Sequence, residues 1–171
     1  LLPVHARNLG ADSSVTGYYL AFSYLALTFG ALSAGWISER LQRRKMPFII
    51  AGLASIPTAW LMGRVDSILG LTILTALLWF CGGSGLALAG IITGMSAGKD
   101  ERGKIFGILS FTGGLGALLG GLSTGFIVDH WGFPAMFTAV AILLVCWPIA
   151  GGFLWLKKTQ LKPRENGAML K

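Results

Sequence analysis

Long apolar runs, separated by short polar clusters, make up most of the chain. Five of these runs are long enough to cross the hydrocarbon core of a bilayer as a helix, which takes about 20 residues. They cover residues 15–37, 46–65, 68–97, 105–128 and 133–156. Because the clusters between them are short, successive helices must run antiparallel. The pattern predicts an all-α, polytopic membrane helical bundle over residues 1–156, followed by a polar cytoplasmic loop or tail over residues 157–171.

The composition supports lipid as the solvent of this bundle. Hydrophobic residues make up 54% of the 171 residues and charged residues only 12%, which is about half the charged share of an ordinary soluble domain. A soluble domain of this length needs more polar surface to cover its core, so a soluble protein is disfavoured. The chain starts without Met, and we expect residues 1–10 to be the outer end of a preceding helix, which would give six spans.

The net charge of +7 is typical of nucleic-acid-binding proteins, so the position of the basic residues matters. Of the 14 basic residues, all except Arg7 and Arg64 lie after the first span, after the third span or in the tail. Cytoplasmic loops of membrane proteins carry such an excess of Lys and Arg. The charge therefore predicts topology, with these loops and the tail in the cytoplasm. We expect the lipid bilayer as a partner, no nucleic acid, and a multi-pass location in a prokaryotic-type plasma (inner) membrane.

The loop after the first span carries a recognisable motif. It reads Gly-Trp-Ile-Ser-Glu-Arg-Leu-Gln-Arg-Arg-Lys over residues 35–45 and resembles the loop signature of the major facilitator superfamily (MFS). Glu39 stands where that signature usually has Asp, and Gln42 where it has Gly. The resemblance implies a cytoplasmic gate made by Gly35, Glu39, Arg40, Arg43 and Arg44. The alternative is that these charges only anchor the loop on the cytoplasmic side.

The fourth predicted span is rich in glycine. Its glycines resemble the glycine-rich fifth helix of the drug-antiporter branch of that family, although Gly121 stands where the branch has Pro and Thr124 where it has Gly. Glycines spaced by four residues permit close helix crossing and local bending. Plain tight helix packing is the alternative explanation of these glycines. A proline kinks a helix, so the replacement of the motif's Pro by Gly121 weakens the assignment to the antiporter branch. The predicted packing or bending positions are Gly107, Gly116, Gly120, Gly121 and Gly125.

The third predicted span aligns with a family motif that places a membrane-embedded Arg before Gly-x-Gly, but Trp79 occupies the Arg position. The stretch Gly-Gly-Ser-Gly at residues 82–85 is not followed by the Gly-Lys-Ser/Thr of a phosphate-binding loop, so a phosphate-binding loop is disfavoured. Residues that could line a mildly polar cavity are Trp79, Ser84, Thr93, Ser110 and Thr112. Hydrogen bonding within the bundle is the other use of these hydroxyls.

The acidic residues all lie outside mid-membrane depth, although buried ionisable groups mark ion and proton routes in membrane proteins. Cys81 and Cys146 lie in apolar runs without metal-ligand spacing, and neither His5 nor His130 lies beside a plausible nucleophile. We therefore expect no coupling site in the visible spans, no metal, no cofactor and no enzymatic activity. His130 follows the fourth span in an acidic-x-x-Gly-aromatic turn, where Gly132 permits a tight reversal.

The resemblance covers nearly the whole chain to about Leu156. It implies most of one six-helix half of an MFS fold: the end of the first helix plus the second to sixth helices. The loop signature favours the N-terminal half; in the alternative, the C-terminal half, residues 157–171 would be the C-terminus of the protein. The function that this implies is secondary active transport of a small-molecule solute by alternating access, with a second half of the transporter as partner. The alternative is a non-transporting polytopic scaffold or receptor.

Overall fold

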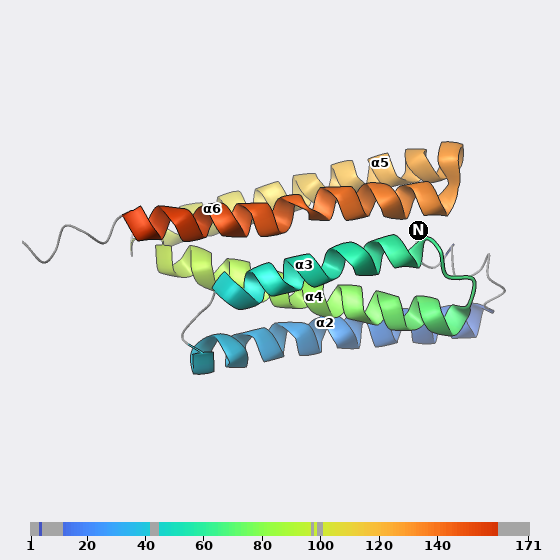
Figure 1. Ribbon diagram of the computed structural model, residues 1–171, viewed down its shortest axis with the longest axis horizontal. Helices are drawn as coiled ribbons and strands as arrows, with labels where there is room; N and C mark the ends of the chain where they lie inside the picture. The colour runs from blue at the N-terminus through green and yellow to red at the C-terminus, as the bar shows by residue number, and fades with distance from the viewer. Residues whose placement is uncertain (1–3, 5–11, 42–44, 97, 99–100, 161–171) are drawn as a thin grey trace, which may run out of the picture.

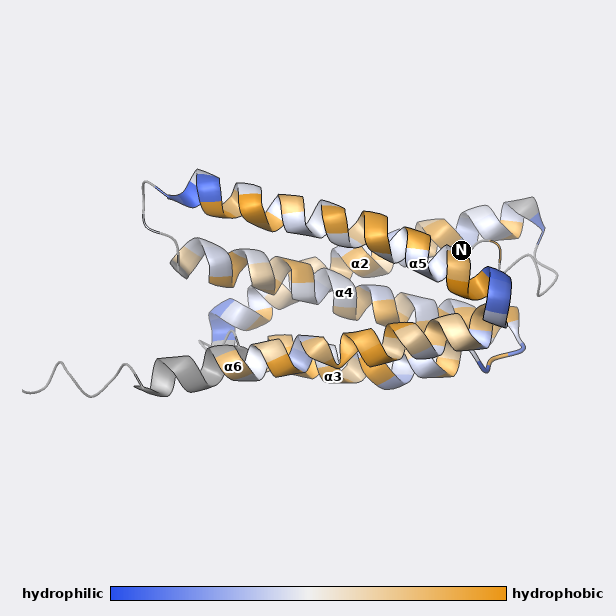
Figure 2. Cartoon of the chain, turned by 90° about the horizontal axis from the view of Figure 1, so that it is seen from above, coloured by the Kyte–Doolittle hydropathy of each residue, from blue (hydrophilic) through white to orange (hydrophobic). Residues whose placement is uncertain are grey.

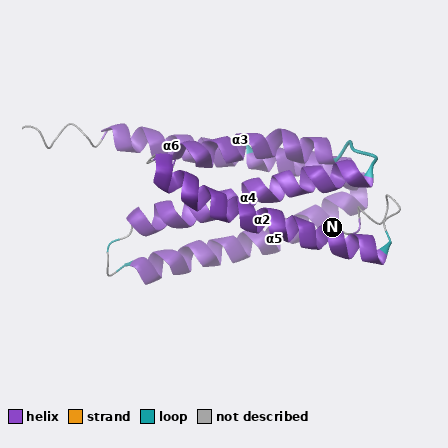
Figure 3. Ribbon diagram, turned by 90° about the horizontal axis from the view of Figure 1, so that it is seen from below, coloured by secondary structure: helices purple, strands orange, loops and turns teal. Residues whose placement is uncertain are grey.

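The computed structural model describes residues 4, 12–41, 45–96, 98 and 101–160 (Figure 1). The expected end of a preceding helix at residues 1–10 lies almost entirely outside this part, as do residues 161–171 of the tail. The described elements, which run along a common axis without any strand (Figure 3), are α2 (Ser13–Leu41), α3 (Lys45–Met62), α4 (Ile68–Ser96), α5 (Arg102–Leu144) and α6 (Cys146–Gln160).

Helix α5 consists of two antiparallel arms that meet at Gly132 (Figure 1). Gly132 has φ 78° and ψ 178°, a conformation that side chains with a Cβ rarely adopt. The reversal predicted at this glycine is therefore present. We call residues 102–131 the first arm. Residues 133–160, which join the second arm of α5 to α6 in one nearly straight element, are called the rod.

A break at Val145 interrupts the rod. Pro148 has no N–H group, so the carbonyl of Leu144 receives no bond from the residue four positions later. The N–H of Val145 donates to the carbonyl oxygen of Ile142, three positions earlier, at 3.1 Å. The last turn before α6 is therefore tighter than an α-helix.

Helix α4 is the central element, because it packs against both α2 and α3, whereas α2 hardly touches α3. Helix α3 also packs against the rod. The core cluster forms where these helices meet, and it consists of Tyr19, Met62, Leu71, Met136 and Phe137. Most of the first arm of α5 is exposed, but Ile127 and Val128 near its end pack against this core. Helix α5 as a whole makes few contacts with α4.

The described chain is a membrane helical bundle. Ser14–Arg40 and Ile68–Met95 are long and apolar enough to cross a membrane, as is the continuous stretch Arg102–Phe153, which Gly132 folds into two arms. Met46–Met62 is a shorter apolar helix. Hydrophobic colour follows the lengths of the helices and hydrophilic colour gathers near their ends (Figure 2). Large apolar side chains also cover the outside, which is the surface that lipid solvates.

Candidate functional site: the loop motif, the α5 glycines and an apolar cavity

The last turn of α2 carries the described part of the loop motif. Glu39 and Arg40 are exposed there, and the Arg40 guanidinium lies 5.1 Å from the centroid of the Trp36 ring. A Cβ atom at Gly35 would meet no described neighbour within 4 Å. Arg43 and Arg44 lie outside the described residues. The structure therefore shows Glu39 and Arg40 of the motif exposed at a helix end.

Ser38 lies inside this motif, and sequence reasoning did not select it. Its side chain is 1% exposed, and its Oγ has no hydrogen-bond partner among the described residues. A buried hydroxyl without a partner is unfavourable by about 1–3 kcal/mol. Its helical spacing from Tyr19, Ser23 and Ala34, which are also buried, could have indicated that it faces the bundle.

Glycines hold α2 and α4 in close contact. A Cβ at Gly30 would overlap the carbonyl oxygen of Phe80, and one at Gly83 would overlap that of Leu27. The Ser84 hydroxyl lies 3.0 Å from the carbonyl oxygen of Gly30 and 2.9 Å from that of Phe80. Ser84 therefore joins two helices rather than facing the cavity described below. Such close crossing through small residues is a main source of helix association in lipid.

The glycines of the first arm of α5 have no such partner. Residues 106–123 are all exposed, and a Cβ at any glycine of this arm would meet no described neighbour within 4 Å. Ser110 and Thr112 are exposed on the same arm, and Thr112 bonds back to the carbonyls of Ile108 and Leu109.

Helical spacing divides these glycines into two stripes rather than one groove. Stripe A consists of Gly107, Gly114, Gly121 and Gly125, and stripe B of Gly113, Gly116 and Gly120. The positions predicted from the sequence for packing or bending therefore fall on opposite sides of the arm.

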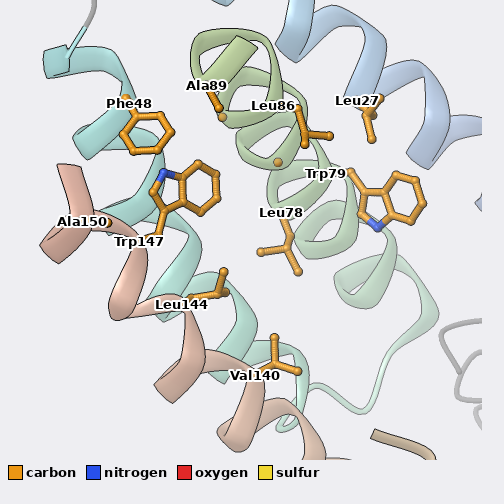
Figure 4. A pocket seen from close by; sticks show the side chains of 12 residues that line it. Leu27, Phe48, Leu78, Trp79, Leu86, Ala89, Val140, Leu144, Trp147 and Ala150 are labelled. Atoms are coloured by element: carbon orange, nitrogen blue, oxygen red, sulfur yellow. The ribbon is translucent and has the colours of Figure 1, made fainter. Parts of the chain in front are cut away.

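An apolar cavity of about 620 Å³ lies along α4 (Figure 4). Trp79 and Leu86 of α4 line it, Leu144 and Trp147 of the rod face them, and no charged side chain takes part. Of the predicted cavity residues, only Trp79 is among its lining residues; Thr93 is half-buried on α4. The Trp79 ring also contacts Tyr24 of α2 edge-on, with 4.9 Å between ring centroids.

Trp147 is the wall residue that sequence reasoning missed. Its ring is wedged between α3 and α4: a Cβ at Gly85 would overlap it, and one at Gly52 would lie 3.1 Å from its Cγ. Figure 4 shows it beside Phe48, at 5.5 Å between ring centroids. Its buried Nε1 has no hydrogen-bond partner among the described residues. The contacts come from three predicted spans, so no local pattern could reveal them.

Aromatic rings surround His130 at the turn after the first arm of α5. His130 is exposed, and its Nδ1 lies 3.0 Å from the carbonyl oxygen of Phe126. Its ring is tilted against those of Phe126 and Trp131, at 4.1 Å and 5.8 Å between centroids. Within the described residues, no group of three or more His, Cys, Asp or Glu is placed to hold a metal ion.

Comparison with known proteins identifies the family. The family model described as Major Facilitator Superfamily matches residues 1–169, which is nearly the whole chain. No curated protein and no solved structure matches the chain. An all-helical membrane bundle with this loop motif agrees with the family match. The chain belongs to the Major Facilitator Superfamily and is a multi-pass component of a membrane transporter.

Proposed function

We propose that this chain forms most of one half of a secondary active transporter, which moves a small solute across the membrane by alternating access. In this mechanism two halves rock about a solute site between them. The observation that carries the proposal is the largely exposed first arm of α5, where a Cβ atom at any stripe A glycine would meet no described neighbour within 4 Å. The stripe supports a second half as the partner, because small residues in a lipid-embedded helix permit close approach of another helix.

The loop motif supplies the second element of the proposal. In the cytoplasmic gate, Glu39 and Arg43 form contacts with the other half in one conformation and lose them in the other. Glu39 lies exposed at the end of α2, so such contacts are sterically open to it. A contact made in only one state shifts the equilibrium between states by its own free energy.

Alternating access can be tested in the full-length transporter without knowing the solute. Gly107 and Gly125 both lie on stripe A, near opposite ends of the arm, and each can be replaced by Cys after Cys81 and Cys146 are replaced by Ala. With Glu39→Ala, we expect reaction with a soluble maleimide to become faster at one position and slower at the other. The control is Lys104→Ala, which removes a charge at the start of α5. Arg40 is not used as the control, because its guanidinium packs on the Trp36 ring and its loss would also remove that contact.

The result decides between gating and general loosening. Reciprocal changes in labelling with Glu39→Ala, and none with Lys104→Ala, support two alternating states. Parallel acceleration at both positions, or no change at either, contradicts alternating access controlled by this loop.

A further inference from the structure

The break at Val145, which we call the pivot, divides the rod into two segments. The N–H of Val145 donates to the carbonyl oxygen of Ile142, three positions earlier, and Pro148 has no N–H to offer to the carbonyl of Leu144. A proline that removes a hydrogen bond in this way is a usual cause of helix bending. The rod is therefore able to bend at the pivot without breaking a further hydrogen bond of a regular helix.

The segment before the pivot is anchored in the core of the bundle. Met136, Phe137 and Ala141 are buried there, and the first two belong to the core cluster together with residues of α2, α3 and α4. The segment beyond the pivot is α6, and within residues 146–153 only Gly151 is buried. A bend at the pivot would therefore displace α6 and leave the first segment in place.

Trp147 holds α6 against the bundle by the shape of its ring. The ring occupies the space that Gly85 of α4 and Gly52 of α3 leave open, and a Cβ atom at Gly85 would overlap it. Its buried Nε1 has no hydrogen-bond partner within the described part of the chain. The ring can therefore leave this seat without breaking a hydrogen bond. The other close approach of α6 is also apolar, because Gly151 lies against the side chain of Ile49 on α3.

The apolar cavity extends along the rod on both sides of the pivot. Its wall on the rod consists of Val140, Leu144, Trp147 and Ala150 (Figure 4). Leu86 of α4 lies in the opposite wall. Movement of α6 away from α4 would open the cavity beside Trp147 and Ala150, whereas the part of the wall made by Val140 would stay closed.

We propose that α6 is a lid on the apolar cavity: it swings at the pivot, and the Trp147 ring latches it closed in the seat between Gly52 and Gly85. The structure shows the closed position. The lid, the pivot and the latch consist of residues of this chain. Their motion therefore needs neither a second half nor alternating access.

Distances between pairs of spin labels in the full-length protein test the lid, after the native cysteines are replaced by Ala. The lid pair joins Leu32 of α2 to Phe153 of α6, beyond the pivot. The reference pair joins Leu25 of α2 to Ile142, before the pivot. All four side chains are exposed, so labelled cysteines at these positions replace no core residue. Electron–electron resonance then measures the distribution of each distance.

Gly85→Ala releases the latch from the side of α4 and leaves the sequence of the rod unchanged. The added methyl group overlaps the Trp147 ring and displaces it from its seat. We expect the lid pair to gain a second, longer distance, with the ratio of open to closed molecules raised about tenfold or more. The reference pair should keep its distance. The matched control is Gly82→Ala on the same helix, where a Cβ atom meets no described neighbour within 4 Å, and neither distance should change.

Pro148→Ala tests the pivot. Alanine supplies the N–H that the carbonyl of Leu144 lacks, so the rod becomes a regular helix that resists bending. When Pro148→Ala is combined with Gly85→Ala, the lid pair should return to a single distance. Trp147→Ala removes the ring instead of displacing it, and it replaces Gly85→Ala in both measurements if that variant yields too little folded protein.

Three outcomes would contradict the lid. An unchanged lid distance in Gly85→Ala and in Trp147→Ala would show that the ring is not a latch. Equal lengthening of the lid pair and the reference pair would mean that the whole rod moves. A second distance that persists with Pro148→Ala would place the bend away from the pivot. No transport is measured, so failure of the lid is distinguished from failure of the proposed function.

Discussion

At the scale of single residues, the two neighbouring glycines Gly82 and Gly83 have opposite surroundings. Gly83 faces the backbone of α2, where even a methyl group overlaps the carbonyl oxygen of Leu27. Gly82, one position earlier on α4, would place a methyl group in open space. Glycine is therefore required for close helix contact at position 83, whereas at position 82 a larger side chain would meet no described atom within 4 Å.

This difference predicts opposite effects of one substitution. Gly83→Ala should destabilise the folded bundle by about 1–3 kcal/mol or more, because backbone atoms must move apart. Gly82→Ala should stabilise it by roughly 0.5–1 kcal/mol, because Ala loses less conformational entropy than Gly in a helix. Thermal unfolding in detergent, followed by the loss of monodisperse protein, measures both changes. Equal midpoints for the two variants would show that α2 and α4 are not in backbone contact.

At the scale of elements, the sequence predicted where helices occur better than which faces pack. Spans are visible because lipid requires long apolar runs, whatever the helices contact. Packing faces are hidden because lipid and core are equally apolar: Leu88 is fully buried, whereas Leu86, two positions away on α4, is 70% exposed. The Trp147 ring fits between α3 and α4 because Gly52 and Gly85, which are far from it in the sequence, leave space for it. Hydropathy along the chain could therefore not predict that Trp147 lines the cavity.

The reversal at Gly132 gives the prediction for this scale. Gly132→Ala places a Cβ on a backbone with φ 78° and ψ 178°, a region essentially confined to glycine, which we expect to destabilise the turn by about 1–3 kcal/mol. The turn fixes the register of the rod against the first arm, so the thermal midpoint should fall. Gly152→Ala, on the rod and free of neighbours within 4 Å, is the matched control. A Gly132→Ala protein as stable as Gly152→Ala would mean that the turn adopts another conformation.

At the scale of the whole molecule, the positions of the basic residues predict orientation. The start of α5, with Arg102 and Lys104, should lie in the cytoplasm, and the turn at His130 should lie outside. Cysteines introduced at Glu101 and His130, both exposed, can be treated with an impermeant maleimide in intact cells. Only position 130 should react before the cells are opened. Labelling of position 101 from outside would reverse the orientation.

The gate motif yields the last prediction, which concerns transport by the full-length protein. Glu39→Ala or Arg43→Ala should reduce transport more than Arg44→Ala, although all three residues belong to one short sequence motif. Removing either gate residue leaves a charge without its partner in one of the two states, which is unfavourable by about 1–3 kcal/mol. That free energy shifts the equilibrium between the states by roughly tenfold or more. Arg44 should face lipid headgroups, so its loss removes only about 1 kcal/mol of surface attraction.

The measurement is the initial rate of solute uptake, divided by the amount of folded protein in the membrane. This division is needed because loss of a cytoplasmic charge also weakens membrane insertion, and insertion responds to all basic residues of the loop alike. Arg43→Ala and Arg44→Ala each remove one positive charge, and the two positions are adjacent. If Arg43 belongs to the gate, the uptake rate per folded protein must still be lower for Arg43→Ala than for Arg44→Ala. If the corrected rates of these two variants are equal, the loop acts as a topological anchor and the gate must be formed elsewhere.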